Sequence, residues 1–176
     1  MRLTLLIFIS ILFAQEEKQT IAILDFSSNG VSQSEVNALT DRLRSELFRL
    51  DTFAIFERGK MMEIIKEQGF QQAVCDNSDC AVEIGKIIGV KKIITGSINK
   101  VGNLYSVSTR IINIETGQIE KVTDYDYDGE IINIMKSGMK TVAKQLVGKE
   151  LDYKDKRSKP WIHIGNKKKD DWNFIY

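Results

Sequence analysis

The fold is decided by residues 20–57, TIAILDFSSNGVSQSEVNALTDRLRSELFRLDTFAIFE. Residues 20–28 form a short apolar run that ends in Asp25 and small polar residues, which is typical of a buried strand. Residues 52–57 form a second short apolar run and predict a second strand. The segment between these two runs has a different periodicity, so the stretch predicts a strand, a helix and a strand.

The helical segment begins with Ser32 and Glu35, whose spacing is that of a capping box. Behind this start, apolar residues recur at helical spacing and form one stripe: Val36, Leu39, Leu43, Leu47 and Leu50. A helix between two strands of one sheet carries the chain back across the face of the sheet, so both strands start from the same end. The two strands are therefore expected to be parallel, with a right-handed connection.

The rest of the chain supplies further elements of both kinds. Residues 58–70 predict a second helix that stops near Gly69, and residues 81–90 predict a third that stops at Gly89. Asp79 is the expected N-cap of the third helix.

Three strands are then expected over residues 91–100, 104–114 and 118–128, joined by tight turns at Gly102 and Gly117. Residues 130–148 predict a last helix. The order β-α-β-α-α-β-β-β-α predicts an α/β fold in which helices pack on a mixed sheet of about five strands.

The first residues, MRLTLLIFISILFA, combine a basic residue, an apolar run and a small residue at position 14. This pattern predicts a signal peptide over residues 1–14, cleaved after Ala14, and hence a periplasmic or exported protein. The apolar run is too short to span a bilayer, so no transmembrane segment is expected after the signal is removed. The expected domain covers residues 20–147.

Residues 148–176 differ from the domain in composition and are expected to form a flexible, basic tail. Its lysines and tryptophans could contact a partner protein or an anionic envelope surface, and the alternative is a solvated tail without a partner. The candidate contact residues are Trp161, Lys167, Lys168, Lys169 and Trp172.

The chain has two cysteines, Cys75 and Cys80, separated by the turn-forming residues DNSD. In an exported chain such a pair predicts a structural disulfide. A redox role is an open alternative, although the spacing is not that of a CxxC site. A metal site would need more ligands, and the one histidine, His163, lies in the tail. We expect no metal and no cofactor.

Catalytic chemistry has little support in the sequence. Asp25 follows a strand, but no phosphate-binding glycine motif accompanies it, so it is expected to be a cap or turn residue. Glu57 and Arg58 could form a local ion pair or begin a helix. DYDYDG at 124–129 resembles the start of a calcium loop, yet the decisive twelfth position is Met135, which favours a strand with one acidic face. The net charge of +1 gives no indication of nucleic-acid binding.

Three segments together resemble the CsgG/HfaB family, the periplasmic domain of curli-type secretion channel subunits. They are LDFSS, ERGKMMEII, and the run from GVKKIITGSI to IETGQI, and the resemblance spans about residues 20–147. The N-terminal domain of TolB has a related fold. The resemblance implies the same α/β fold, an envelope location and a role in secretion or envelope assembly.

Two features differ from the channel members of the family. Those members are lipoproteins with long membrane-crossing hairpins, whereas this chain has no cysteine near Ala14 and has tight turns at both strand connections. We therefore expect a non-enzymatic exported protein that acts by protein-protein contact and could form a homo-oligomer. The alternatives are a secretion channel subunit proper and an exported thiol-disulfide redox protein.

Overall fold

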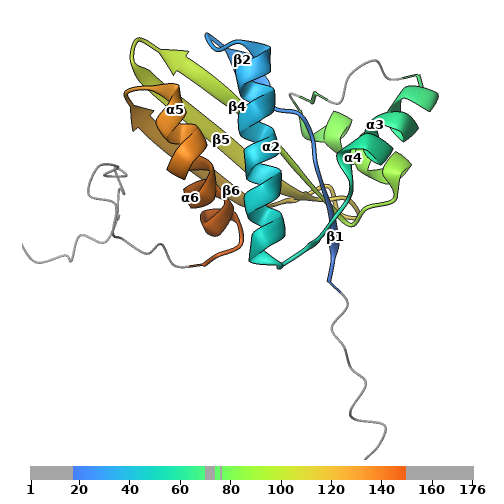
Figure 1. Ribbon diagram of the computed structural model, residues 1–176. Helices are drawn as coiled ribbons and strands as arrows, with labels where there is room; N and C mark the ends of the chain where they lie inside the picture. The colour runs from blue at the N-terminus through green and yellow to red at the C-terminus, as the bar shows by residue number, and fades with distance from the viewer. Residues whose placement is uncertain (1–17, 70–73, 76, 150–176) are drawn as a thin grey trace, which may run out of the picture.

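A computed structural model describes residues 18–69, 74–75 and 77–149. The predicted signal peptide at 1–14 and all the candidate contact residues of the tail lie outside these ranges. Figure 1 shows a mixed sheet with helices on both faces. The strands are β1 (Thr20–Ile23), β2 (Ser27–Asn29), β3 (Ala54–Ile55), β4 (Lys92–Val101), β5 (Leu104–Asn113) and β6 (Ile119–Asp128).

The helices follow the order that the sequence predicts. They are α2 (Gln33–Leu50), α3 (Arg58–Glu67), α4 (Ser78–Ile88), and a last helical run made of α5 (Ile131–Asn133), a π turn η1 (Ile134–Gly138) and α6 (Met139–Leu146). The predicted α/β class and element order are confirmed. Within the described residues, none of these helices is both long enough and apolar enough to cross a membrane.

The sheet has the strand order β3-β1-β4-β5-β6, and β2 pairs separately with β4. β1 is parallel to β3 and to β4, as a strand-helix-strand crossover requires. β4, β5 and β6 are antiparallel neighbours. The expected strand over residues 20–28 is divided into β1 and β2, and between them Asp25 makes an isolated bridge to Val74.

α2 begins as the sequence predicts. The Ser32 side chain accepts a hydrogen bond from the Glu35 amide, and the Glu35 carboxylate accepts one from the Ser32 amide at 3.1 Å. This capping box satisfies amides that the first turn leaves unpaired. The predicted stripe faces the sheet, and its members Val36, Leu39, Leu43 and Leu47 are buried.

The sheet separates two apolar cores. α2 and α6 cover one face, where they pack on side chains such as Ile23, Ile94 and Val107. α3 and α4 cover part of the other face and pack on Leu24, Ile93 and other buried residues. Strand alternation produces this division, because successive residues of β1 and β4 point to opposite faces.

The last helical run keeps its apolar stripe on the sheet by means of the π turn. Ile134 and Met139 lie five residues apart and are both fully buried. A regular α-helix would rotate the later residue away from the sheet, whereas the wider π turn holds both against it.

Candidate functional site

Asp25 is the buried centre of a charge cluster at the carboxyl end of β1. Arg58 Nη2 donates to Asp25 Oδ2 at 2.6 Å, and Arg44 Nη2 donates to Asp25 Oδ1 at 2.7 Å. Arg44 also donates to the carbonyl of Ile23 at 2.9 Å. The expectation that Asp25 is a cap or turn residue is wrong, because both of its carboxylate oxygens are bound by guanidinium groups.

The charge cluster controls the ionisation of its members. Burial alone would raise the pKa of Asp25, but hydrogen bonds and charge from Arg58 and Arg44 outweigh it and hold the pKa below the ordinary value. The Asp25 carboxylate in turn raises the pKa of Arg58. Asp25 is therefore ionised at neutral pH, and both of its oxygens accept hydrogen bonds from arginine side chains.

Glu57 and Arg58 have separate roles. Glu57 is the N-cap of α3, and its carboxylate accepts hydrogen bonds from the amides of Gly59 at 2.8 Å and Lys60 at 2.9 Å. These two bonds lower the pKa of Glu57. The helix-start interpretation is confirmed, and Arg58 pairs with Asp25 rather than with its neighbour.

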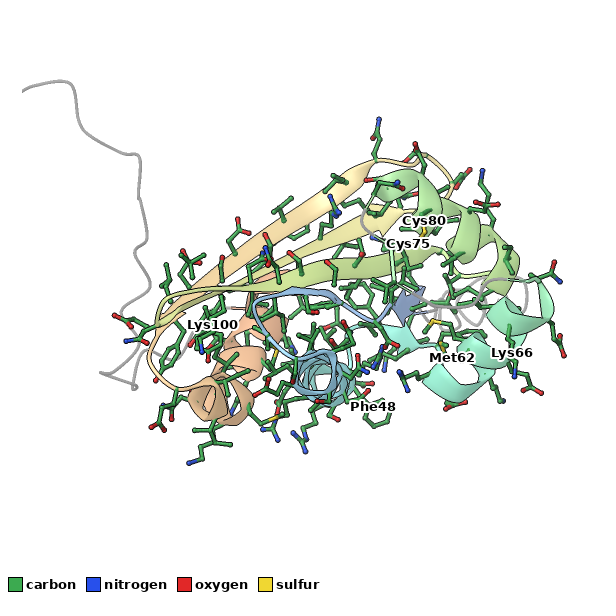
Figure 2. All side chains as sticks on the ribbon, turned by 90° about the horizontal axis from the view of Figure 1, so that it is seen from above. Phe48, Met62, Lys66, Cys75, Cys80 and Lys100 are labelled. Atoms are coloured by element: carbon green, nitrogen blue, oxygen red, sulfur yellow. A yellow bond between two sulfur atoms is a disulfide. The ribbon has the colours of Figure 1, made fainter. Side chains whose placement is uncertain are left out.

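A shallow groove adjoins the charge cluster between α2 and α3. It has a volume of about 470 Å³. Phe48, on the outer side of α2, lies at the groove and is 73% exposed (Figure 2). The groove, called here the Phe48 groove, is lined by Arg44, Ser45, Phe48, Arg49, Ile55, Phe56, Glu57 and Arg58.

An exposed aromatic ring beside guanidinium groups is a composition typical of protein contact surfaces. This groove is not among the features predicted from the sequence. One feature of the predicted fold did point to the charge cluster. The parallel strands β1 and β3 finish at the same end of the sheet, which brings Asp25 close to the residues after β3.

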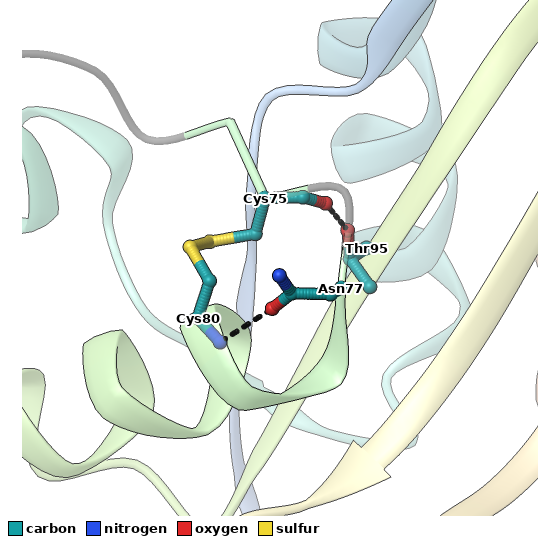
Figure 3. The surroundings of a disulfide bond; sticks show 4 residues. All are labelled: Cys75, Asn77, Cys80 and Thr95. Carbon is teal, nitrogen blue, oxygen red and sulfur yellow. Dashed lines mark hydrogen bonds between the residues drawn. A yellow bond between two sulfur atoms is a disulfide. The ribbon is translucent and has the colours of Figure 1, made fainter.

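Cys75 and Cys80 form a disulfide with an S–S distance of 2.02 Å and a Cα–Cα distance of 5.6 Å (Figure 3). Thr95 Oγ1 donates to the Cys75 carbonyl at 3.0 Å, which attaches this loop to β4. Asn77 Oδ1 accepts from the Cys80 amide at 2.8 Å. Asn77, not Asp79, is thus the N-cap of α4, because the helix begins at Ser78 and Asp79 lies within its first turn.

The disulfide is expected to act as a structural link. Replacing both cysteines with serine should lower the free energy of unfolding by about 2 kcal/mol, because the closed loop is short. Urea unfolding of the two proteins measures this difference. Mass spectrometry of the unreduced protein should show no alkylated thiol. An in-cell activity lost at unchanged stability would instead support the redox alternative.

The three acidic residues of DYDYDG lie on β6 and do not form a loop. Asp124, Asp126 and Asp128 are exposed on one face of the strand, while Tyr125 is buried on the other. The strand with one acidic face is therefore confirmed. In the described residues, no group of three or more His, Cys, Asp or Glu side chains could hold a metal ion.

The fold and this surface define a small mixed α/β domain with an exposed groove between α2 and α3. The family of the curli production assembly/transport component CsgG matches residues 7–110, which is more than half of the chain. The chain belongs to this family. No curated protein matches it.

Solved structures with the same fold have low sequence identity to this chain. The LpoB C-terminal domain from Salmonella enterica is 15% identical, with a TM-score of 0.53 over 71% of this chain and 93% of that one. Lipoprotein GNA1162 from Neisseria meningitidis is 13% identical, with a TM-score of 0.54 over 73% of this chain and 99% of that one. At such identities the likeness shows the fold alone.

Proposed function

We propose that this protein is a non-enzymatic, envelope-associated member of the CsgG family that acts by contact with other proteins in outer-membrane secretion or envelope assembly. The observation that carries this proposal is the family match over residues 7–110, since the family is described as a curli production assembly and transport component. The predicted signal peptide supports a periplasmic location.

The geometry around Asp25 supports a role in protein-protein contact rather than in catalysis. The carboxylate is bound by Arg44 and Arg58, so it holds two of the side chains that line the Phe48 groove. The exposed ring of Phe48 lines the same groove between α2 and α3. An aromatic anchor with its surroundings fixed in advance loses little freedom on binding, which favours protein association.

Site-specific photo-cross-linking in cells tests this function. A photoreactive phenylalanine analogue at position 48 should cross-link to a protein of the secretion or assembly apparatus, identified by mass spectrometry of the envelope fraction. The same analogue at Lys66, an exposed position on α3, is the control and should give no such product.

Two results would contradict the proposal. One is a protein that fractionates with the cytoplasm. The other is an envelope-located protein that cross-links to no secretion or assembly component from position 48 or from any other exposed position.

The family description also favours a second candidate, an outer-membrane secretion channel subunit, because it names transport. Reproducible stepwise conductance in planar bilayers exposed to the purified protein would favour this candidate. A homo-oligomer is compatible with both candidates, and sedimentation of the purified protein measures it.

A further inference from the structure

β6 is a long edge strand with one side open. Nine of its 10 residues pair with β5 along one side, and no described residue forms a strand along the other. The opposite edge of the sheet is β3, which has 2 residues. A long edge offers a row of backbone N–H and C=O groups to which another extended segment can add as a new strand.

The part of the chain after β6 that the structure describes does not pair with this edge. β1 connects to β3 over the face that carries α2 and α6, and β6 runs in the same direction as β1. A crossover from β6 over that same face to a new parallel strand on its own open edge would have the opposite hand to the right-handed β1–α2–β3 crossover. Left-handed crossovers are very rare. The open edge is therefore better suited to a segment from another molecule.

The side chains of the edge select the charge of such a segment. Asp124, Asp126 and Asp128 alternate along β6, so they share one face of the sheet at intervals of about 7 Å. All three are exposed. Their face is the one that α4 covers at one end only, and Figure 2 shows the hairpin end near Lys100 without a helix above it.

The same carboxylates disfavour pairing of β6 with the β6 strand of a second copy. Such a pair would place like charges opposite one another, which is destabilising in a sheet. A segment with Lys or Arg at every second residue would instead place a cation beside each carboxylate.

A hollow next to the open edge of β6 enlarges the surface that an added segment would contact. It lies between the end of α6 and β6, with a volume of about 640 Å³, and its lining includes Val122, Asp124 and Gln145. The buried Oε1 of Gln145 has no hydrogen-bond partner among the described residues. Buried amide oxygens are normally satisfied, and a backbone N–H of an added segment is one donor that would satisfy this oxygen. Lys121 and Lys149 also line the hollow, which makes this end of the edge less acidic than the end near Asp128.

We propose that β6 accepts, as an added strand, an extended segment of another protein that carries Lys or Arg at every second residue. This proposal rests on the proposed function, because it specifies one surface through which the protein contacts partners. The added strand would pair with the open edge of β6, place its cations over Asp124, Asp126 and Asp128, and bring a donor to Gln145.

A synthetic peptide of alternating lysine and threonine tests the proposal with the purified mature protein. Binding is measured by fluorescence anisotropy, and backbone pairing by hydrogen exchange of the β6 amides. We expect the peptide to bind and to protect β6. Changing Asp124, Asp126 and Asp128 together to asparagine should weaken binding about tenfold. A peptide of the same composition with its lysines in one block should bind less well.

The matched control removes three carboxylates elsewhere. Changing Glu63, Glu67 and Glu83 to glutamine alters the net charge equally, and these exposed residues lie on α3 and α4. This control variant should bind the peptide like the wild type. Equal weakening in both triple variants, binding without protection of β6, or no binding at all would each overturn the proposal. If envelope cross-links from position 48 persist in that case, the proposed function is unaffected.

Discussion

Replacing Asp25 with alanine is expected to lower the free energy of unfolding by about 3 kcal/mol, measured by urea unfolding at neutral pH. The substitution leaves the guanidinium of Arg44, which is nearly buried, without its main partner. An uncompensated buried charge is costly, whereas a pair with all its hydrogen bonds made is not. Arg58 is more than one third exposed, so solvent screening makes its share of the loss smaller.

Asp41 provides the control for this result. It pairs with the same Arg44, but its side chain is mostly exposed. Asp41→Ala should therefore cost less than about 1 kcal/mol. Equal losses for the two variants would contradict the interpretation of Asp25 as the buried centre of the cluster.

The pH dependence of the Asp25 effect has a definite sign. The pKa of Asp25 is lowered from 3.8 in the folded protein, so the folded state keeps the carboxylate ionised to lower pH than the unfolded chain. Its stabilisation is then complete above the unfolded pKa and is lost as the pH falls through the folded pKa. The stability difference between wild type and Asp25→Asn should shrink in acid. A difference that does not change with pH would disprove this linkage.

Replacing Gly96 with alanine should have a similar effect, a loss of about 3 kcal/mol. The new Cβ would lie 2.4 Å from the carbonyl oxygen of Ser108 on β5 and 3.0 Å from the ring of Phe26. The first of these neighbours is backbone in the middle of a sheet, and the second is a fully buried aromatic ring. Neither can move without disturbing the strand pairing or the core.

Two further variants identify the source of the Gly96 effect. Ser97→Ala changes the next residue, which is only half-buried and points to the other face, and should alter stability by no more than about 0.5 kcal/mol. Adding Phe26→Leu to Gly96→Ala should not restore stability, because the clash with the Ser108 carbonyl remains. Full recovery in the double variant would show that the ring alone sets the cost.

Much of the fold could be predicted because its signals are local. Ser32 and Glu35 are three residues apart, and the turn at Gly102 lies between two apolar runs. The positive φ of 60° at Gly102 explains why glycine is needed there. The buried residues of β5, including Tyr105 and Val107, follow from simple alternation.

The candidate site was harder to predict because its contacts join distant parts of the chain. Asp25 meets Arg44 and Arg58 at sequence separations of 19 and 33 residues, and no local pattern couples them. The ends of helices and strands were also predicted less accurately than their order along the chain. The strand expected over 52–57 is reduced to β3, and the N-cap of α4 is Asn77 rather than Asp79. Cap choice between two neighbouring polar residues depends on tertiary packing, which the sequence pattern does not contain.

The division of the interior into two cores has a consequence for motion. A single sheet carries both cores, so the layer formed by α3 and α4 can detach from its face while α2 and α6 stay packed on the other. Amide hydrogens of α3 and α4 should then exchange through a partial opening that leaves the larger core intact. The bond between Cys75 and Cys80 closes a short loop within that smaller unit, so it should limit the conformational freedom that this unit gains in the partly open form.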